Sequence, residues 1–226
     1  MPEPFLSAIV SVGGGARGFV VQPRRERRYV ITARHCLRMM PRSSFIGAFV
    51  GELVHSDHEP LARYDGGPGP WPLPSWPKQR ITRHQEAEFR RGAIALQPIL
   101  IHDTQDIAVL GVPGDDTEAY DAFVGSREAL VLGPPPRTTE LFNAKLLSLD
   151  GAWFDCEAVW HTEHYPVVYI KEFAKPLLEG MSGSPIIDDN GRAFGVVFKV
   201  GLLEGEAVCL VRCLPEWLWS FDPGER

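Results

Sequence analysis

The sequence predicts an all-β protein that is organised as a pair of antiparallel barrels. Short stretches of apolar and β-branched residues recur along the chain, and turns rich in glycine, proline and asparagine separate them. Almost no stretch has the periodicity of a helix. A length of 226 residues suits one large all-β unit or two small packed barrels. Together these observations favour the pair of barrels.

The predicted strands of the first half begin close to the N-terminus. They cover residues 7–13, 18–22, 29–33, 43–51, 92–101 and 106–110, with a charged hairpin tip at residues 24–28. The third strand runs almost directly into His35, so this histidine is expected at a strand end, where its side chain can face a cleft. The alternative is a surface histidine at a turn.

Two carboxylates compete for a role beside this histidine. Asp106 directly precedes the apolar residues 107–110 and therefore stands at the mouth of a buried strand. It could instead accept hydrogen bonds from local backbone N–H groups. Asp103 lies close by in the sequence but has no apolar strand directly behind it. We therefore expect Asp106 to be the functional carboxylate.

A proline-rich stretch separates the histidine from these carboxylates. Within residues 52–91 the pattern of strands dissolves, and alternate prolines exclude a central strand or a helix: Pro68, Pro70, Pro72, Pro74 and Pro77. This stretch is predicted to be an extended surface loop. Trp71 and Trp76 in it either cover the core or form an apolar wall for a ligand.

The second half of the chain follows a polar linker predicted at residues 113–128. Strands are predicted at residues 129–132, 141–149, 153–160, 167–170, 184–187, 193–200 and 207–211. The segment from Asp188 to Gly191 predicts a hairpin with a type I′ turn, because Asn-Gly suits that geometry. Residues 214–221 predict a short closing helix with Pro215 in its first turn.

Ser182 lies in the stretch with the strongest chemical signal. Residues 180–185 read Gly-Met-Ser-Gly-Ser-Pro, directly ahead of an apolar strand. Glycines on both sides allow a sharp turn and a close approach of substrate, and such a turn can present backbone N–H groups to an oxyanion. An ordinary hairpin loop is the alternative, since glycine and serine are common in turns.

The composition excludes several other classes of function. The 23 basic and 29 acidic residues give a net charge of −6, so nucleic-acid or anionic-membrane binding has no electrostatic support. No export signal or membrane-spanning apolar run is visible, and a cytoplasmic location is expected. The four cysteines are expected to be free thiols. The His55–His58 and His161–His164 pairs lack further ligands at a recognised spacing, so no metal and no cofactor are expected.

Three ordered motifs resemble those of the chymotrypsin-like (trypsin-like) serine peptidases. The segment ending at His35-Cys36 matches Thr-Ala-x-His-Cys, and the segment beginning at Asp106 matches Asp-Ile-Ala-Val-Leu. The turn around Ser182 matches Gly-[Asp/Asn]-Ser-Gly-[Gly/Ser]-Pro except at Met181. The order His, Asp, Ser is also that of this family and differs from the order in subtilisins and α/β-hydrolases.

The resemblance implies two six-stranded barrels, with residues 1–112 in the first, residues 113–128 linking them and residues 129–226 in the second. His35 would be the general base, Asp106 its orienter and Ser182 the nucleophile. The N–H groups of Gly180 and Ser182 would form the oxyanion hole. The substrate pocket would map to Pro176 and to Phe198, Lys199 and Val200. Without an acid at residue 176, small or medium apolar side chains are expected before the cleaved bond.

Departures from the family pattern favour an intracellular, bacterial type of member. Met181 stands where secreted members have an aspartate, so no proteolytic maturation is expected. Val20 stands where the usual disulfide partner of Cys36 would be, which favours the same type. Phe198 is a separate departure: it replaces a serine that bonds the catalytic aspartate in many members, so that support for Asp106 is missing.

The sequence therefore predicts a serine endopeptidase that acts on proteins or peptides. The alternative is a catalytically weak or inactive peptide-binding module on the same fold. A separately encoded recognition or regulatory protein is the expected kind of partner beyond the substrate.

Overall fold

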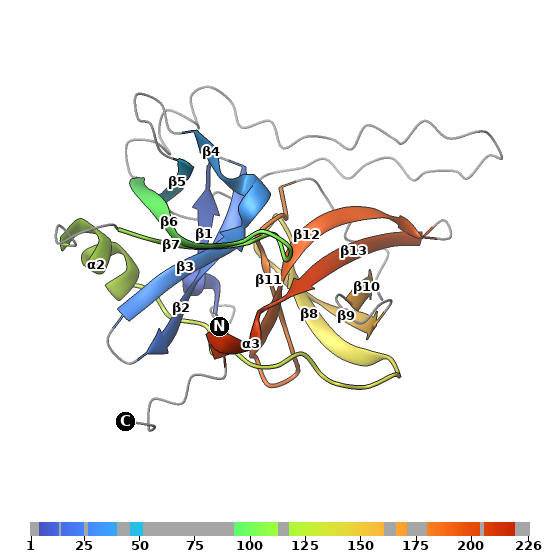
Figure 1. Cartoon of the computed structure of the whole chain (residues 1–226). Helices are drawn as coiled ribbons and strands as arrows, with labels where there is room; N and C mark the ends of the chain where they lie inside the picture. Colours follow the sequence, from blue (N-terminus) through green and yellow to red (C-terminus); the bar gives the residue numbers. More distant parts are fainter. Residues whose placement is uncertain are drawn as a thin grey trace.

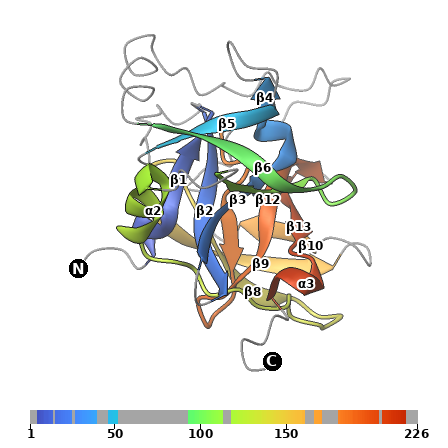
Figure 2. The ribbon, with the colours of Figure 1, turned by 60° about the vertical axis from the view of Figure 1, so that its left-hand side comes forward.

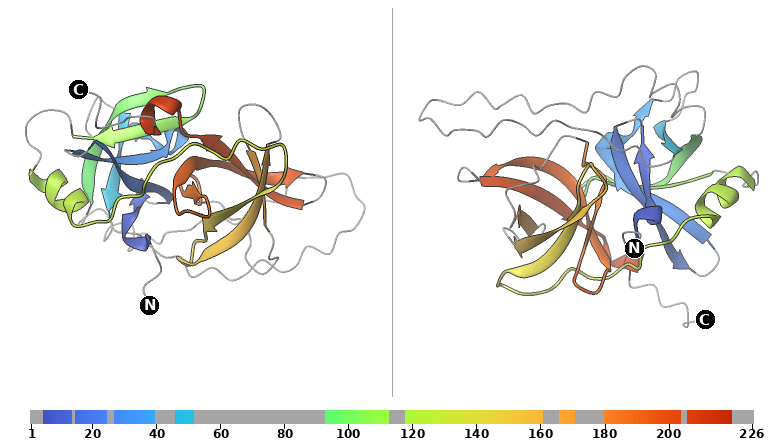
Figure 3. Two further views of the ribbon diagram at one scale, coloured as in Figure 1. Left: turned by 90° about the horizontal axis from the view of Figure 1, so that it is seen from below. Right: turned by 180° about the vertical axis from the view of Figure 1, so that it is seen from behind.

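The computed structural model describes residues 5–13, 15–24, 27–39, 46–51, 93–112, 118–160, 166–170, 180–203 and 206–219. It confirms the all-β class and the pair of barrels. In Figure 1, strands from the N-terminal half, in blue and green, form one assembly, and strands in yellow to red form a second beside it. The view from behind in Figure 3 shows the same arrangement.

The first assembly is a seven-stranded antiparallel sheet that closes on itself. Its strands are β1 (Ile9–Val12), β2 (Ala16–Arg24), β3 (Arg27–Ala33), β4 (Arg38–Met39), β5 (Ile46–Gly51), β6 (Ile94–His102) and β7 (Ile107–Gly111). Their order is β1-β2-β3-β7-β6-β5-β4, and β1 also pairs with β5. Six strands therefore form a ring, and β4 extends it from β5. The two-residue strand β4 was not predicted.

The second assembly is a closed barrel of six strands. They are β8 (Phe142–Leu147), β9 (Trp153–Trp160), β10 (Pro166–Ile170), β11 (Pro185–Ile187), β12 (Ala193–Leu203) and β13 (Glu206–Cys213). The order is β10-β13-β12-β11-β8-β9, with all pairs antiparallel. Residues of β11 and β12 alternate between the barrel interior and the first barrel, so Ile186 and Phe194 pack in the second core while Ile187 and Val196 join the first.

The segment between the barrels is more structured than a polar linker. Residues 118–125 form helix α2 (Glu118–Gly125), which packs beside the first barrel (Figure 2). Tyr120 and Val124, one turn apart, are buried, and the Arg28 guanidinium donates hydrogen bonds to the Val124 and Gly125 carbonyls at the helix end. Because only these two positions of the helix are buried, its sequence shows little of the apolar periodicity from which a helix is predicted.

The predicted strand at residues 129–132 is wrong. This stretch forms two isolated parallel bridges, from Leu130 to Val21 of the first barrel and from Leu132 to Ala193 of the second. Leu130 and Leu132 are two residues apart, and each forms a bridge with a different strand, so the segment does not pair along a single strand. The extended segment thus connects the barrels through its backbone, with one hydrogen bond to Val20 of the first barrel and two to Ala193 of the second.

The type I′ turn predicted at Asp188–Gly191 is also wrong. Gly191 has φ of +74°, but Asn190, the other central residue of a type I′ turn, does not have positive φ. The Asp188 N–H donates to the Arg192 carbonyl, so the loop contains three residues with glycine in the left-handed position. The Asp188 carboxylate accepts bonds from the N–H groups of Asn190 and Arg192 and thereby favours the longer loop.

The predicted closing helix is present as α3 (Glu216–Trp219). Pro215 precedes it, and the Pro215 carbonyl accepts a hydrogen bond from the N–H of Leu218. Within the described ranges, no helix has the length and apolar character needed to cross a membrane. The proline-rich stretch of residues 52–91, Pro176 and the His55–His58 and His161–His164 pairs lie outside the described residues.

Candidate active site

His35 lies where the first barrel meets the second. Strand β3 ends at Ala33, and the chain turns through the single 3₁₀ turn η2 (Arg34–Cys36). The Arg34 N–H donates to the Asp106 carbonyl over 2.8 Å, which fixes this turn against the beginning of β7. The His35 side chain remains 44% exposed, so its imidazole is accessible to a substrate.

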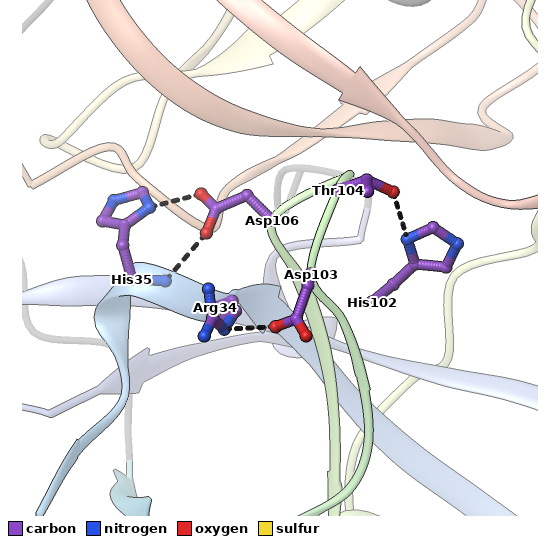
Figure 4. A network of polar contacts seen from close by, with 6 residues as sticks. All are labelled: Arg34, His35, His102, Asp103, Thr104 and Asp106. Carbon is purple, nitrogen blue, oxygen red and sulfur yellow. Dashed lines mark hydrogen bonds and ion pairs between the residues drawn. The ribbon is translucent and has the colours of Figure 1, made fainter.

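Asp106 holds the imidazole from one side. Its Oδ2 lies 2.5 Å from His35 Nδ1, and its Oδ1 accepts a hydrogen bond of 3.0 Å from the His35 backbone N–H (Figure 4). The Asp106 backbone has φ of +54°, a left-handed conformation that aspartate tolerates better than most residues. The side chain is only 15% exposed. A carboxylate with two bonds to one histidine determines both the orientation and the tautomer of the ring.

Asp103 has a different partner. Its Oδ1 lies 2.9 Å from Arg34 Nε, and both side chains are largely exposed, at 72% and 49%. Figure 4 shows the two carboxylates directed to different partners, Asp106 to the histidine and Asp103 to the arginine. The Asp106 carboxylate therefore contacts the histidine, as the sequence led us to expect, and Asp103 does not share this contact.

Ser182 occupies a tight turn ahead of β11. Gly180 and Gly183 both have positive φ, at +105° and +85°. The N–H of Gly183 donates to the Val197 carbonyl and that of Ser184 to the Met181 carbonyl, each over 2.9 Å. Among the described residues no carbonyl accepts a hydrogen bond from the Ser182 N–H. Met181 is fully buried in the second core and anchors the turn by packing.

Contacts with the first barrel bring this turn to the same junction as His35. The Ser182 carbonyl accepts a bond of 2.9 Å from the Arg17 N–H of β2, and the Arg17 carbonyl accepts one of 2.6 Å from the Thr32 hydroxyl of β3. Thr32 lies three residues before His35 on the same strand and turn. A side chain at Gly183 would place its Cβ 1.9 Å from the Arg17 carbonyl oxygen, so only glycine permits this approach.

Phe198 connects the second barrel to the histidine. The pairing of β12 with β13 shifts register between Val197 and Lys199, so Phe198 is the extra residue of a β-bulge. Its ring meets the His35 ring edge-on, with centroids 6.3 Å apart, and the Arg212 guanidinium lies 4.5 Å from the Phe198 centroid. Bulges next to functional sites re-aim a side chain in this way.

The other predicted pocket residues are only partly placed. Lys199 is exposed, and the side chain of Val200 lies outside the described part, as does Pro176. The sequence reasoning did not identify Arg17, Thr32 or Arg212 as neighbours of the site. Thr32 belongs to the histidine motif and could have been noticed there, whereas nothing local distinguishes Arg17 or Arg212.

Asp106 also changes the charge of His35. Its hydrogen bond raises the pKa of His35 well above the ordinary value of 6.5, and a contact with Cys36 adds to this, while partial burial opposes it. Folding therefore favours the imidazolium, which contributes stability in full below about pH 6.5 and loses it as pH rises through the raised pKa. The neutral imidazole, which is the form that can accept a proton, therefore becomes more populated as pH rises over the same range.

No metal site accompanies this arrangement in the described ranges, where no three ligating side chains gather. The four cysteines, Cys36, Cys156, Cys209 and Cys213, are all buried and none forms a disulfide. The groups at this junction that are suited to nucleophilic chemistry are a serine, a histidine and a carboxylate.

The sequence matches no protein-family model and no curated protein. The fold, in contrast, is similar to solved structures. Tobacco etch virus protease superimposes with a TM-score of 0.53 at 14% identity, over 96% of this chain and 78% of that one. Human heparin binding protein gives a TM-score of 0.52 at 13% identity, over 100% of this chain and 97% of that one. The chain therefore has the chymotrypsin-like double-barrel fold, as the sequence motifs implied.

Proposed function

We propose that this chain is a serine endopeptidase that uses His35, Asp106 and Ser182 and forms an acyl-enzyme intermediate. The observation that carries the proposal is the paired hydrogen bonding of Asp106 to the ring and backbone of His35. It occurs at the junction where the glycine-flanked Ser182 turn contacts the first barrel. The chymotrypsin-like fold, shared with a viral protease, supports the same conclusion.

In the proposed mechanism, Ser182 Oγ attacks the carbonyl carbon of the substrate while His35 Nε2 accepts the serine proton. Asp106 stabilises the resulting imidazolium through Nδ1. The N–H groups of Gly180 and Ser182 donate to the oxyanion. His35 then gives its proton to the leaving amine, and water repeats the sequence in reverse to release the acid and regenerate Ser182.

Labelling with a fluorophosphonate probe tests this proposal. The serine hydroxyl displaces fluoride from phosphorus only when a base activates it, so the wild-type protein is expected to be labelled at Ser182. Ser182→Ala is expected to remain unlabelled, and peptide mapping identifies the modified residue. A folded wild-type protein that is not labelled would refute the proposed activity.

A catalytically weak or inactive peptide-binding module is the second candidate. Phe198 favours it, because an aromatic ring contacts His35 where many chymotrypsin-like peptidases have a serine that bonds the catalytic aspartate. Peptide binding by a wild-type protein that the probe does not label would support this candidate.

The proposed substrates are proteins or peptides with small or medium apolar residues before the cleaved bond. No acid stands at Pro176 to pair with an Arg or Lys side chain of the substrate. A peptide library is therefore expected to be cut mainly after residues such as Ala or Val. Predominant cleavage after Arg or Lys, mapped by mass spectrometry, would contradict this specificity.

Activity is expected without proteolytic maturation. Ile9 and Val10 are fully buried in β1 and pair with β2, so neither is available as a new N-terminus. Met181 is uncharged, and burial of an ammonium beside it would be costly. Protein beginning at Met1 should therefore hydrolyse peptides, and protein cut to begin at Ile9 should be no more active. Activity confined to the cut form would contradict this account.

The cellular location of the enzyme and its partners are also proposals. Four buried cysteines without a disulfide suit a reducing compartment, so we propose that the enzyme acts in the cytoplasm. The net charge of −6 supports neither nucleic acid nor an anionic membrane as partner. A separately encoded recognition or regulatory protein remains the proposed partner beyond the substrate.

A further inference from the structure

Arg17 has an unusual environment for an arginine in a small β-barrel. Its side chain is only 2% exposed. The guanidinium Nη1 donates to the Leu147 carbonyl over 3.1 Å and to the Ser148 carbonyl over 2.7 Å. Both carbonyls lie at the end of β8, so the side chain extends from the first barrel into the second. Burial lowers the pKa of Arg17 to about 10, and the nearby Asp150 partly offsets this, so the guanidinium stays charged at neutral pH.

The backbone of the same residue contacts both parts of the candidate active site. Its N–H donates to the Ser182 carbonyl, and its carbonyl accepts from the hydroxyl of Thr32, on the strand that leads to His35. The Gly183 backbone packs directly against that carbonyl. Arg17 therefore contacts the nucleophile turn, the strand of the general base and the end of β8 at once.

We propose that Arg17 is a positioning residue for the Ser182–His35 pair, acting through its guanidinium. This inference rests on the proposed peptidase function. The two side-chain bonds hold β2 against the second barrel, and β2 in turn holds the Ser182 turn through the backbone bond. The reacting atoms of such a pair tolerate little displacement, since a shift of about 1 Å can lower a rate about 10²-fold.

Arg28 provides a matched control because its side chain makes the same kind of contact elsewhere. Its Nη1 donates to the Val124 carbonyl over 2.8 Å and to the Gly125 carbonyl over 3.2 Å, at the end of α2. It stands near the beginning of β3, at the opposite end of the strand from His35. Arg28 also donates to the Arg127 carbonyl, and it is partly exposed where Arg17 is buried. If arginine–carbonyl bonds had only a structural role, loss of either guanidinium should affect the Ser182 turn to a similar extent.

The test compares Arg17→Met, Arg17→Lys and Arg28→Met in the full chain. The first measurement is the rate of fluorophosphonate labelling at Ser182 as a function of pH. The second is hydrogen exchange of the Gly183 and Ser184 amides, which does not depend on catalysis. For Arg17→Met we expect labelling to be at least about 10-fold slower with an unchanged pH midpoint, and faster exchange of both amides. Arg17→Lys should recover part of the rate, because an ammonium can still donate to one of the two carbonyls, and Arg28→Met should match wild type in both.

The outcomes separate this inference from the proposed function. An unlabelled wild type refutes the peptidase, and the exchange measurement then decides the role of Arg17 alone. Wild-type labelling and protected amides in Arg17→Met would overturn the inference, as would equal losses in Arg17→Met and Arg28→Met. If Arg17→Met does not fold, Arg17→Lys decides, and a lysine variant with the wild-type rate and exchange overturns the inference.

Discussion

Replacement of Ser182 by alanine is expected to lower kcat for peptide hydrolysis by about 10⁶-fold. In the proposed mechanism, the substitution removes the atom that forms the covalent bond to the acyl group. Ser182 is half-buried and its hydroxyl has no hydrogen-bond partner among the described residues, so the fold should not change. Steady-state hydrolysis of a peptide substrate gives the rate, and circular dichroism and thermal unfolding verify the fold.

His35→Ala is the companion variant for this measurement. Because serine and base act as a unit, His35→Ala should cost about as much as Ser182→Ala, and the double variant should cost little more. Near-normal turnover in both single variants would show that the activity arises elsewhere in the chain.

Asp106→Asn is expected to lower kcat by about 10⁴-fold, because an amide in place of the carboxylate favours the wrong imidazole tautomer. The carboxylate also raises the pKa of His35, so its removal should move that pKa down toward 6.5. The rising limb of the plot of kcat/KM against pH should therefore shift to lower pH. Residual activity measured across a pH series tests both effects.

Asp103→Asn is the matched control for this variant. Asp103 pairs with Arg34 on the surface, and exposed pairs of this kind contribute about 0–1 kcal/mol to stability. The variant should retain the wild-type rate and pH profile. A large loss in Asp103→Asn together with a small one in Asp106→Asn would reverse the roles assigned to the two carboxylates.

Much of the fold could be predicted because the residues that favour a strand, and the turns that end it, are neighbours in the sequence. Strand β9 was predicted with its observed bounds, and β3, β7 and β12 were predicted within a few residues. Alternation of side chains and the turn residues between strands depend on neighbours in the sequence, so they are visible without a structure. Helix α2 and the bridges at residues 130 and 132 were missed because each depends on contacts with distant strands.

The candidate site, like the fold, has features that the sequence predicts and features that depend on tertiary contacts. The sequence by itself determined the three motifs and the residues they nominate, His35, Asp106 and Ser182, since each motif is continuous in the chain. Only the tertiary structure showed the contact itself, in which the Asp106 carboxylate meets a histidine that lies 71 residues away in the sequence. Only the tertiary structure revealed Arg17 and the bulge at Phe198, since a buried guanidinium and a register shift are defined by segments that meet on folding. Local propensity acts over a few residues, whereas the geometry of reacting groups is decided by packing between strands that are far apart in the sequence.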